Sequence, residues 1–427
     1  MMNRTSNRSS RKINTSLRGI LCLLALFSVA LSACTGAGPN QKIQLTMWYW
    51  NRSIDDSLIQ QVGRVFPNID LHAEKITDYD SKVRTSMAGH HGVPDILGIN
   101  SNIATYFPDE DQFVDLRTLG ADSIKSQYLD WKWNLGVAPG GRLIALPMDT
   151  GPTALFYRAD LFAKAGLPTD PQAVTNQLKT WDDYIQAGLK LKQATNGKVF
   201  MFDNINNVFS QSVGQHALQY FDRSDHYIGT QDIVKQAWTL ANQVKQDGIS
   251  ANIANWTTEW NAGVSNGTIA SFVGAVWMKQ ILQDAAPNTK GQWRIARNPG
   301  GDGNSGGSFL AVTKASAHPQ EAFEVVKWLE NPTNQLTAYK SLQLFPSTLS
   351  TFDQPGMNSN EDFYGGQDTN QVFSVAAKDI PRFYFNAYSD IVAGAYSDQL
   401  SLIALQNKSP DQAWNDAQTE IQRQLLR

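Results

Sequence analysis

Ile43-Gln-Leu-Thr-Met-Trp-Tyr-Trp50 opens the stretch of sequence that decides the fold. Its residues alternate at first and then become aromatic, which predicts a buried strand running towards an open edge. Ser53 is expected to cap an amphipathic helix, followed by a strand at 69–73, a helix at 78–87 and a strand at 94–99. Alternating strands and helices at this spacing are typical of βαβ units, so the predicted class is α/β with a mostly parallel sheet.

The same alternation continues along the chain. Strands are expected at 143–146 and 308–313, and helices after Thr180 and from Pro319. The segment 409–426 has the pattern of a C-terminal amphipathic helix. No repeat of 20–50 residues is evident, which argues against solenoids and propellers.

Composition limits the function classes. The chain has 427 residues, of which 42% are hydrophobic and 18% charged, with a formal net charge of -3. This composition excludes a disordered chain and allows two or three domains. The even charge balance argues against a nucleic-acid binder, and no nucleic-acid partner is expected.

The amino terminus has the pattern of a bacterial lipoprotein leader. A basic segment is followed by an apolar run at 20–31 that is too short to span a bilayer, and then by Leu31-Ser-Ala-Cys34. We therefore expect residues 1–33 to be a signal peptide, Cys34 to carry lipid such as palmitate, and 34–41 to be a flexible tether. The expected location is the extracytoplasmic face of the cell membrane.

Most of the sequence patterns that could indicate catalysis or cofactor binding are rejected, because the neighbouring residues do not match what each pattern requires. Gly301-x-Gly303-x-x-Gly306 matches the dinucleotide pattern, but a strand rather than a helix is expected after it, so a flexible glycine loop is the better interpretation. The six histidines lack zinc-binding spacing. No cofactor, metal or catalytic residue is predicted, although a carboxylate pair for glycoside hydrolysis stays open.

The number and position of the aromatic residues are the most informative feature of the sequence for a ligand site. The chain has 12 Trp, 13 Tyr and 19 Phe, and three aromatic groups lie near expected strand ends, at 48–50, Trp277 and 383–385. Ligands of open α/β sheets bind beyond the carboxyl ends of the strands. Flat rings can stack on the apolar faces of sugars, while core packing is the alternative for any single ring.

With these features the chain resembles the extracellular solute-binding proteins of carbohydrate-uptake ABC transporters, the group that includes maltose-binding protein. The most specific segment is 142–167, which contains Leu-Ile-Ala-Leu-Pro-Met-Asp-Thr-Gly-Pro. Weaker matches are 45–50, 92–97, 180–184, 274–277 and 306–312, which appear in the order that is usual in the family.

The resemblance implies a two-lobed periplasmic-binding-protein fold, in which each lobe is a mostly parallel sheet flanked by helices. Residues 42–148 plus about 310–345 would form the N-lobe, and 149–309 plus about 346–427 the C-lobe. Hinge crossovers are implied near 147–152, near 306–311 and around 345–346.

The resemblance also implies a set of ligand contacts. Most of them are polar or aromatic residues of loops that face a cleft between the lobes, and Gly307 lies at a crossover. The implied contacts are Trp50, Asn51, Arg52, Asn100, Ser101, Asn102, Asp149, Thr150, Asn204, Trp277, Gly307 and Tyr384. Asn102 stands where maltose binders favour an acidic residue, which argues against maltose as the ligand.

The implied function is capture of a sugar, most simply an oligosaccharide, and its delivery to an ABC transporter permease. The protein would be a monomer, a binder rather than an enzyme, and would contact the membrane through the lipid on Cys34. Two alternatives stay open: the same fold with a non-sugar solute (a polyamine, a phosphate ester or a metal) and a lipid-anchored glycan hydrolase.

Overall fold

A computed structural model describes residues 42–358 and 360–426. The expected signal peptide, the lipidation site at Cys34 and the expected tether at 34–41 lie outside the described residues. Residues 44–427 form one compact unit.

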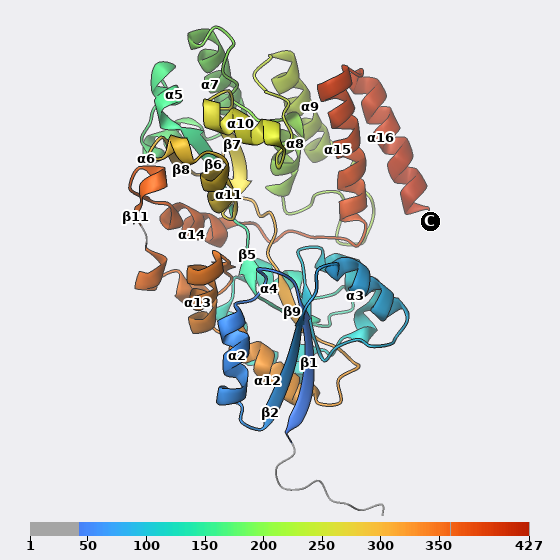
Figure 1. The fold of residues 1–427 in the computed structure, drawn as a ribbon. Coiled ribbons are helices and arrows are strands. Elements are labelled where there is room, and N and C mark those ends of the chain that lie inside the picture. The colour runs from blue at the N-terminus through green and yellow to red at the C-terminus, as the bar shows by residue number, and fades with distance from the viewer. Residues whose placement is uncertain (1–41, 359, 427) are drawn as a thin grey trace, which may run out of the picture. The chain divides into compact units, whose positions relative to one another are not determined.

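A five-stranded sheet is built from segments that are far apart in the sequence (Figure 1). β1 pairs parallel to β3, whereas β9 is antiparallel to both β3 and β4. The order is β2-β1-β3-β9-β4. The strands are β1 (Ile43–Tyr49), β2 (Ile69–Lys75), β3 (Ile96–Ile99), β4 (Ala145–Pro147) and β9 (Phe309–Val312).

Helices α2 (Asp56–Val65), α3 (Tyr79–Ala88) and α12 (Pro319–Leu329) accompany this sheet. The N-cap of α2 is Asp55, which accepts a hydrogen bond from Ser57 N, so the prediction of Ser53 as the cap is wrong. Ser53 Oγ instead donates to the carbonyl oxygen of Trp50 at 2.7 Å and closes the turn that precedes the helix.

A second, three-stranded sheet has the order β7-β6-β8. β6 (Thr153–Arg158) lies in the centre and is antiparallel to both β7 (Ser271–Ala275) and β8 (Trp293–Ala296). Its core includes a stacked pair, Phe156 and Phe272, with ring centroids 4.9 Å apart. Each sheet therefore contains one strand, β9 or β6, that runs against its neighbours.

The helices that follow β6 begin at clear capping signals. Thr180 is the N-cap of α7 (Trp181–Ala194), which confirms the helix expected after it, and it forms a capping box with Asp183. Two long helices, α15 (Ser389–Gln406) and α16 (Pro410–Leu425), lie side by side at the C-terminus (Figure 1).

The other helices and short strands complete the fold. The helices are α4 (Asp130–Leu135), α5 (Ala159–Lys164), α6 (Pro171–Gln177), α8 (Ile205–Gly214), α9 (Asp232–Gln246), α10 (Thr258–Asn266), α11 (Met278–Ala285), α13 (Pro332–Leu342) and α14 (Thr369–Asp379). The short strands are β5 (Asp149–Thr150), β10 (Phe345–Pro346), β11 (Asn360–Glu361) and β12 (Gln367–Asp368). The α/β class is thereby confirmed.

Candidate functional site

Three chain segments meet between the two sheets. Thr150 Oγ1 donates to the carbonyl oxygen of Pro346 at 3.1 Å, within the antiparallel pair β5–β10. The backbone N–H of Ser308 donates to Asp149 Oδ1 at 2.7 Å, and that of Ser305 donates to the carbonyl oxygen of Gly151 at 2.8 Å. These are the three segments in which the resemblance implies crossovers, and the structure brings them into direct contact.

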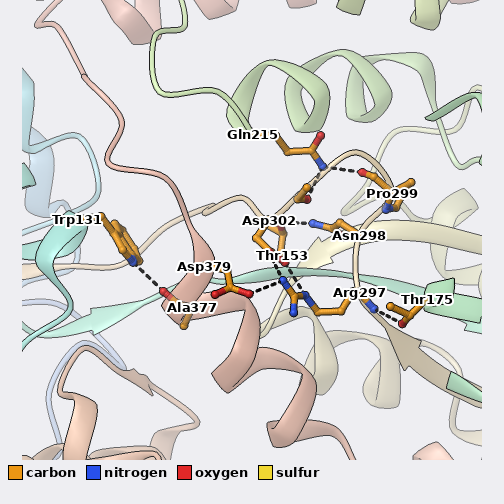
Figure 2. A network of polar contacts seen from close by, with 11 residues as sticks. Trp131, Thr153, Thr175, Gln215, Arg297, Asn298, Pro299, Asp302, Ala377 and Asp379 are labelled. Carbon is orange, nitrogen blue, oxygen red and sulfur yellow. Dashed lines mark hydrogen bonds and ion pairs between the residues drawn. The ribbon is translucent and has the colours of Figure 1, made fainter. Parts of the chain in front are cut away.

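The glycine-rich loop 297–307 is anchored by polar contacts at its start (Figure 2). Arg297 forms ion pairs with Asp302 and Asp379, while Asn298 Nδ2 donates to Thr153 Oγ1 at 2.6 Å. Gln215 Nε2 donates to two backbone carbonyl oxygens of the loop at 2.8 Å. These contacts hold a loop that the sequence analysis interpreted as flexible.

The end of this loop forms one wall of a cavity of about 290 Å³. Its volume lies near the lower end of the ~300–1,000 Å³ that is usual for small-molecule sites. The lining consists of loop 304–307, the loop and helix residues after β3, α4, the end of α8, and the segment around α15. The lining residues are Ser101, Ile103, Lys132, Leu135, Ser210, Gln211, Val213, Gly214, Gln219, Tyr220, Asn304, Ser305, Gly306, Gly307, Phe383, Phe385, Ser389, Asp390 and Ala393.

The cavity combines rings and amides with a balanced pair of charges. Tyr220, Phe383 and Phe385 supply aromatic surface, and the neutral polar groups are serines, glutamines and one asparagine. Lys132 is its one lysine and Asp390 its one aspartate, and the described lining holds no arginine, histidine or glutamate. Such a lining favours an uncharged ligand with many hydroxyl groups, because amides and hydroxyls can both donate and accept.

Lys132 has the most unusual environment in the cavity wall. Its side chain is fully buried, and its Nζ lies 3.5 Å from the centroid of the Phe309 ring. No protein group that the structure describes accepts a hydrogen bond from this Nζ. Burial lowers the pKa of Lys132 to about 7, and attraction to Asp149 opposes this shift.

Two of the predicted contacts, Ser101 and Gly307, line this cavity. Gly307 has φ 88°, and a Cβ there would lie 2.7 Å from the carbonyl oxygen of Asp149. Glycine is therefore required for the close approach of this loop to β5. Asp149 and Thr150 support the wall through their hydrogen bonds to Ser308 and Pro346 and do not line the cavity themselves.

Trp277 lies beside the cavity wall. Its Nε1 donates to the carbonyl oxygen of Ser305 at 2.9 Å, and Ser305 lines the cavity. One face of the Trp277 ring stacks on Trp256, with centroids 5.3 Å apart and planes at 20°. Trp256 has 62% of its surface exposed and a φ of 71°. The two indoles form a paired aromatic surface that the sequence analysis noticed only in part.

The residues predicted after β1 and β3 lie mostly outside this cavity. The ring of Trp50 packs against Tyr79 with centroids 4.9 Å apart, and Arg52 Nη2 donates to the carbonyl oxygen of Leu342. Asn51 is exposed, and Asn100 Oδ1 accepts the N–H of Ser101 at 2.7 Å. The half-buried Asn102 precedes a short 3₁₀ helix and is not part of the cavity lining.

Asn204 and Tyr384 hold local structure. Asn204 is the N-cap of α8, and its Oδ1 accepts the N–H of Asn207 at 2.7 Å. Tyr384 donates its hydroxyl hydrogen to Asp225 and lines two further cavities of about 160 and 600 Å³. It therefore lies near the 290 Å³ cavity, whose wall includes its neighbours Phe383 and Phe385.

The main residues that sequence reasoning missed are Lys132, Asn304 and Asp390. Lys132 carried a usable signal, because it is a single charge between Trp131 and Trp133. Asn304 lies within the glycine-rich loop, whose role depends on contacts with distant residues. Asp390 resembles an ordinary acidic residue in the first turn of a helix.

The described residues contain neither a metal-binding cluster nor a helix that could span a membrane. In 42–358 and 360–426, no group of three or more His, Cys, Asp or Glu side chains could hold a metal ion. Within the same ranges, none of the helices has the length and apolar character needed to cross a bilayer.

The chain is similar to known binding proteins in sequence and in fold. The arabinooligosaccharide-binding protein of Bacillus subtilis (strain 168) is 24% identical over 341 residues, which cover 74% of this chain and 75% of that protein. The lactose-binding protein of Rhizobium radiobacter is 23% identical over 391 residues, which cover 86% of this chain and 89% of that protein. The crystal structure of an extracellular solute-binding protein of family 1 superposes with a TM-score of 0.86 at 28% identity, covering 89% of this chain and 99% of that one.

The superposition confirms the periplasmic-binding-protein fold that the resemblance implied. Residues 65–364 match the family described as bacterial extracellular solute-binding protein. This match extends over more than half of the chain and includes β3, β6, α4 and the loop 297–307. The chain therefore belongs to the bacterial extracellular solute-binding proteins.

Proposed function

We propose that this protein captures a neutral oligosaccharide for uptake by an ABC transporter. The observation that carries the proposal is the cavity lining, in which three rings and many neutral polar groups surround one cation and one anion. The similar proteins of Bacillus subtilis and Rhizobium radiobacter, which bind arabino-oligosaccharides and lactose by name, support a sugar ligand.

Three neighbouring cavities support an oligosaccharide rather than a single sugar unit. The 290 Å³ cavity and a neighbouring cavity of about 160 Å³ share Leu135, Phe383 and Phe385. The 160 Å³ cavity in turn shares Phe107 and Tyr384 with a third, of about 600 Å³. Aromatic rings thus recur in neighbouring cavities that share lining residues, as stacking of successive sugar units would require.

The same lining argues against the non-sugar solutes. A polyamine would need several carboxylates, and this cavity has Asp390 alone. A phosphate ester would need more cations than Lys132, together with arginine forks that this lining does not contain. Amides and hydroxyls suit neither ligand as well as they suit a sugar.

Capture would depend on two lobes that close on the ligand. We propose the lobes with the boundaries given above, 42–148 plus about 310–345 and 149–309 plus about 346–427. A ligand that contacts both lobes stabilises the closed state in proportion to its differential affinity, and the permease would recognise that state. We propose that lipid on Cys34 holds the monomeric protein at the extracytoplasmic face of the membrane.

A thermal-shift screen tests the proposed function. The panel consists of arabino-oligosaccharides, lactose, maltose, spermidine and glucose 6-phosphate. A ligand that binds only the folded state raises Tm. At a free ligand concentration of 100 times Kd, it increases the free energy of unfolding by about 2.7 kcal/mol. We expect at least one neutral glycan to raise Tm and the charged compounds to leave it unchanged. If spermidine or glucose 6-phosphate raised Tm and no neutral glycan did, the proposal would be contradicted.

The hydrolase alternative needs a separate readout. Each neutral glycan of the panel is incubated with the protein and its chain length is then measured by chromatography. We expect the glycans to be recovered intact. Shortened products that form with the protein but not with a mock purification would show turnover. That result would contradict the proposal of a binding protein without enzymatic activity.

A further inference from the structure

Lys132 is held in place by its own helix, but its ammonium has no hydrogen-bond acceptor among the residues that the structure describes. It lies on α4, and the neighbouring Trp131 fixes this helix by donating Nε1–H to the carbonyl oxygen of Ala377 at 2.8 Å (Figure 2). The side chain of Lys132 is 0% exposed and forms part of the cavity wall. Its ammonium carries three donors, none of which has an acceptor among the residues that the structure describes.

Burial of the Lys132 ammonium costs free energy unless another group accepts its hydrogen bonds. A buried charge loses its hydration, and the Phe309 ring beneath the ammonium recovers only part of that loss. Asp149 attracts Lys132, but its Oδ1 already accepts the N–H of Ser308. Lys132 is one of the residues that line the cavity, so a bound ligand is the group that could supply the missing acceptor.

We propose that the ammonium of Lys132 donates hydrogen bonds to a hydroxyl or ring oxygen of the bound sugar, and that Asp390 accepts a hydrogen bond from another hydroxyl of the same ligand. The inference rests on the proposed function and deepens it. It assigns Lys132 as a binding residue and the pair Lys132–Asp390 as the element that selects uncharged sugars.

The selection follows from the balance of charge. Lys132 and Asp390 are the one cation and the one anion of the described lining, and Asp149, which attracts Lys132, is a second carboxylate outside the lining. A uronic acid would gain one attraction from Lys132 and meet repulsion from two carboxylates. A neutral sugar can satisfy donor and acceptor together without adding charge to a buried site.

The variant Lys132→Met tests this inference in the full-length protein. Methionine keeps an unbranched side chain of similar length and removes every donor. A hydrogen bond to a charged group contributes about 1.5–3 kcal/mol, so Kd for the neutral panel glycan that raises Tm most should rise about 10- to 100-fold by calorimetry. Digalacturonate, used as the anionic probe, should bind the wild type more weakly than that glycan.

Lys279→Met is the matched control. Lys279 is also buried, with 4% of its surface exposed, but its Nζ is paired with Glu361 at 2.6 Å and it does not line the cavity. This control should lower the Tm of the ligand-free protein and leave Kd unchanged. Lys132→Met should show the opposite pattern, with weaker binding and little loss of ligand-free Tm.

A second variant covers the case in which Lys132→Met fails to fold because Asp149 is left without its cation. Lys132→Met combined with Asp149→Asn removes both charges and keeps an oxygen for Ser308 N–H. It should also bind the glycan at least tenfold more weakly.

The outcomes separate the two proposals. If the wild type binds a neutral glycan and either folded Lys132 variant binds it with unchanged Kd, the inference is wrong and the proposed function stands. If digalacturonate binds more tightly than every neutral glycan, the charge selection is wrong. If no panel glycan binds the wild type, the proposed function fails and the inference fails with it.

Discussion

Asp203 is a buried carboxyl group whose titration links pH to stability. Its side chain is 1% exposed, and burial raises its pKa from the ordinary 3.8 to about 7, although Asn204 N–H and Asn207 Nδ2 donate to it. Because its pKa in the folded state exceeds that in the unfolded state, the folded chain binds the proton more tightly. This contribution to stability is complete below about pH 4 and is lost as the pH rises to about 7.

The variant Asp203→Asn should remove that part of the pH dependence. The amide keeps an oxygen for Asn204 N–H and cannot lose a proton. Urea unfolding at pH 4, 5.5 and 7 should therefore show a smaller decrease in the free energy of unfolding for the variant than for the wild type. Parallel curves for the two proteins would show that Asp203 does not titrate in this range.

Single residues also show the limits of prediction from sequence. Ser101 and Gly307 were predicted to contact the ligand, and they line the cavity. Asn204 was chosen by its place in a loop, yet its oxygen caps α8. Lys132 was missed because its environment depends on the Phe309 ring against which its ammonium packs, a residue 177 positions away in the sequence. Local patterns cannot reveal contacts of that kind.

At the scale of elements, prediction was more successful because periodicity and capping are local. The expected strands at 69–73 and 308–313 correspond to β2 and β9, and the helix from Pro319 is α12. The expectation of mostly parallel sheets did not include the antiparallel pairing of β6 and β9, because each of them pairs with strands that are distant in the sequence. Loop 297–307 was interpreted as flexible for the same reason, because its anchors come from other elements.

The capping box of α7 gives a prediction at this scale. Thr180 accepts the N–H of Asp183, and Asp183 accepts the N–H of Thr180. Thr180→Ala removes the first of these bonds and should lower the free energy of unfolding by about 1 kcal/mol. Thr180→Ser keeps the hydroxyl and is the control. Urea denaturation that gives equal stability for all three proteins would contradict the role of this cap.

At the scale of the whole molecule, the cavity depends on contacts between distant parts of the chain. Thr150 and Pro346 are 196 positions apart, and Asp149 and Ser308 are 159 apart, yet each pair is hydrogen-bonded. Neither spacing nor hydropathy could predict these contacts, and only the family resemblance implied that these segments are crossovers between lobes. The same resemblance was less informative about side chains, since several implied contacts lie outside the cavity.

Calorimetric titration with a length series tests the central claim most directly. The wild-type protein is titrated with the monosaccharide, disaccharide and trisaccharide of the neutral glycan that raises Tm most. The neighbouring cavities around Phe385 and Tyr384 predict saturable binding with one site per chain, and Kd should fall with each added sugar unit. Equal affinity for all three lengths, or no saturable heat with any of them, would contradict capture of an oligosaccharide in these cavities.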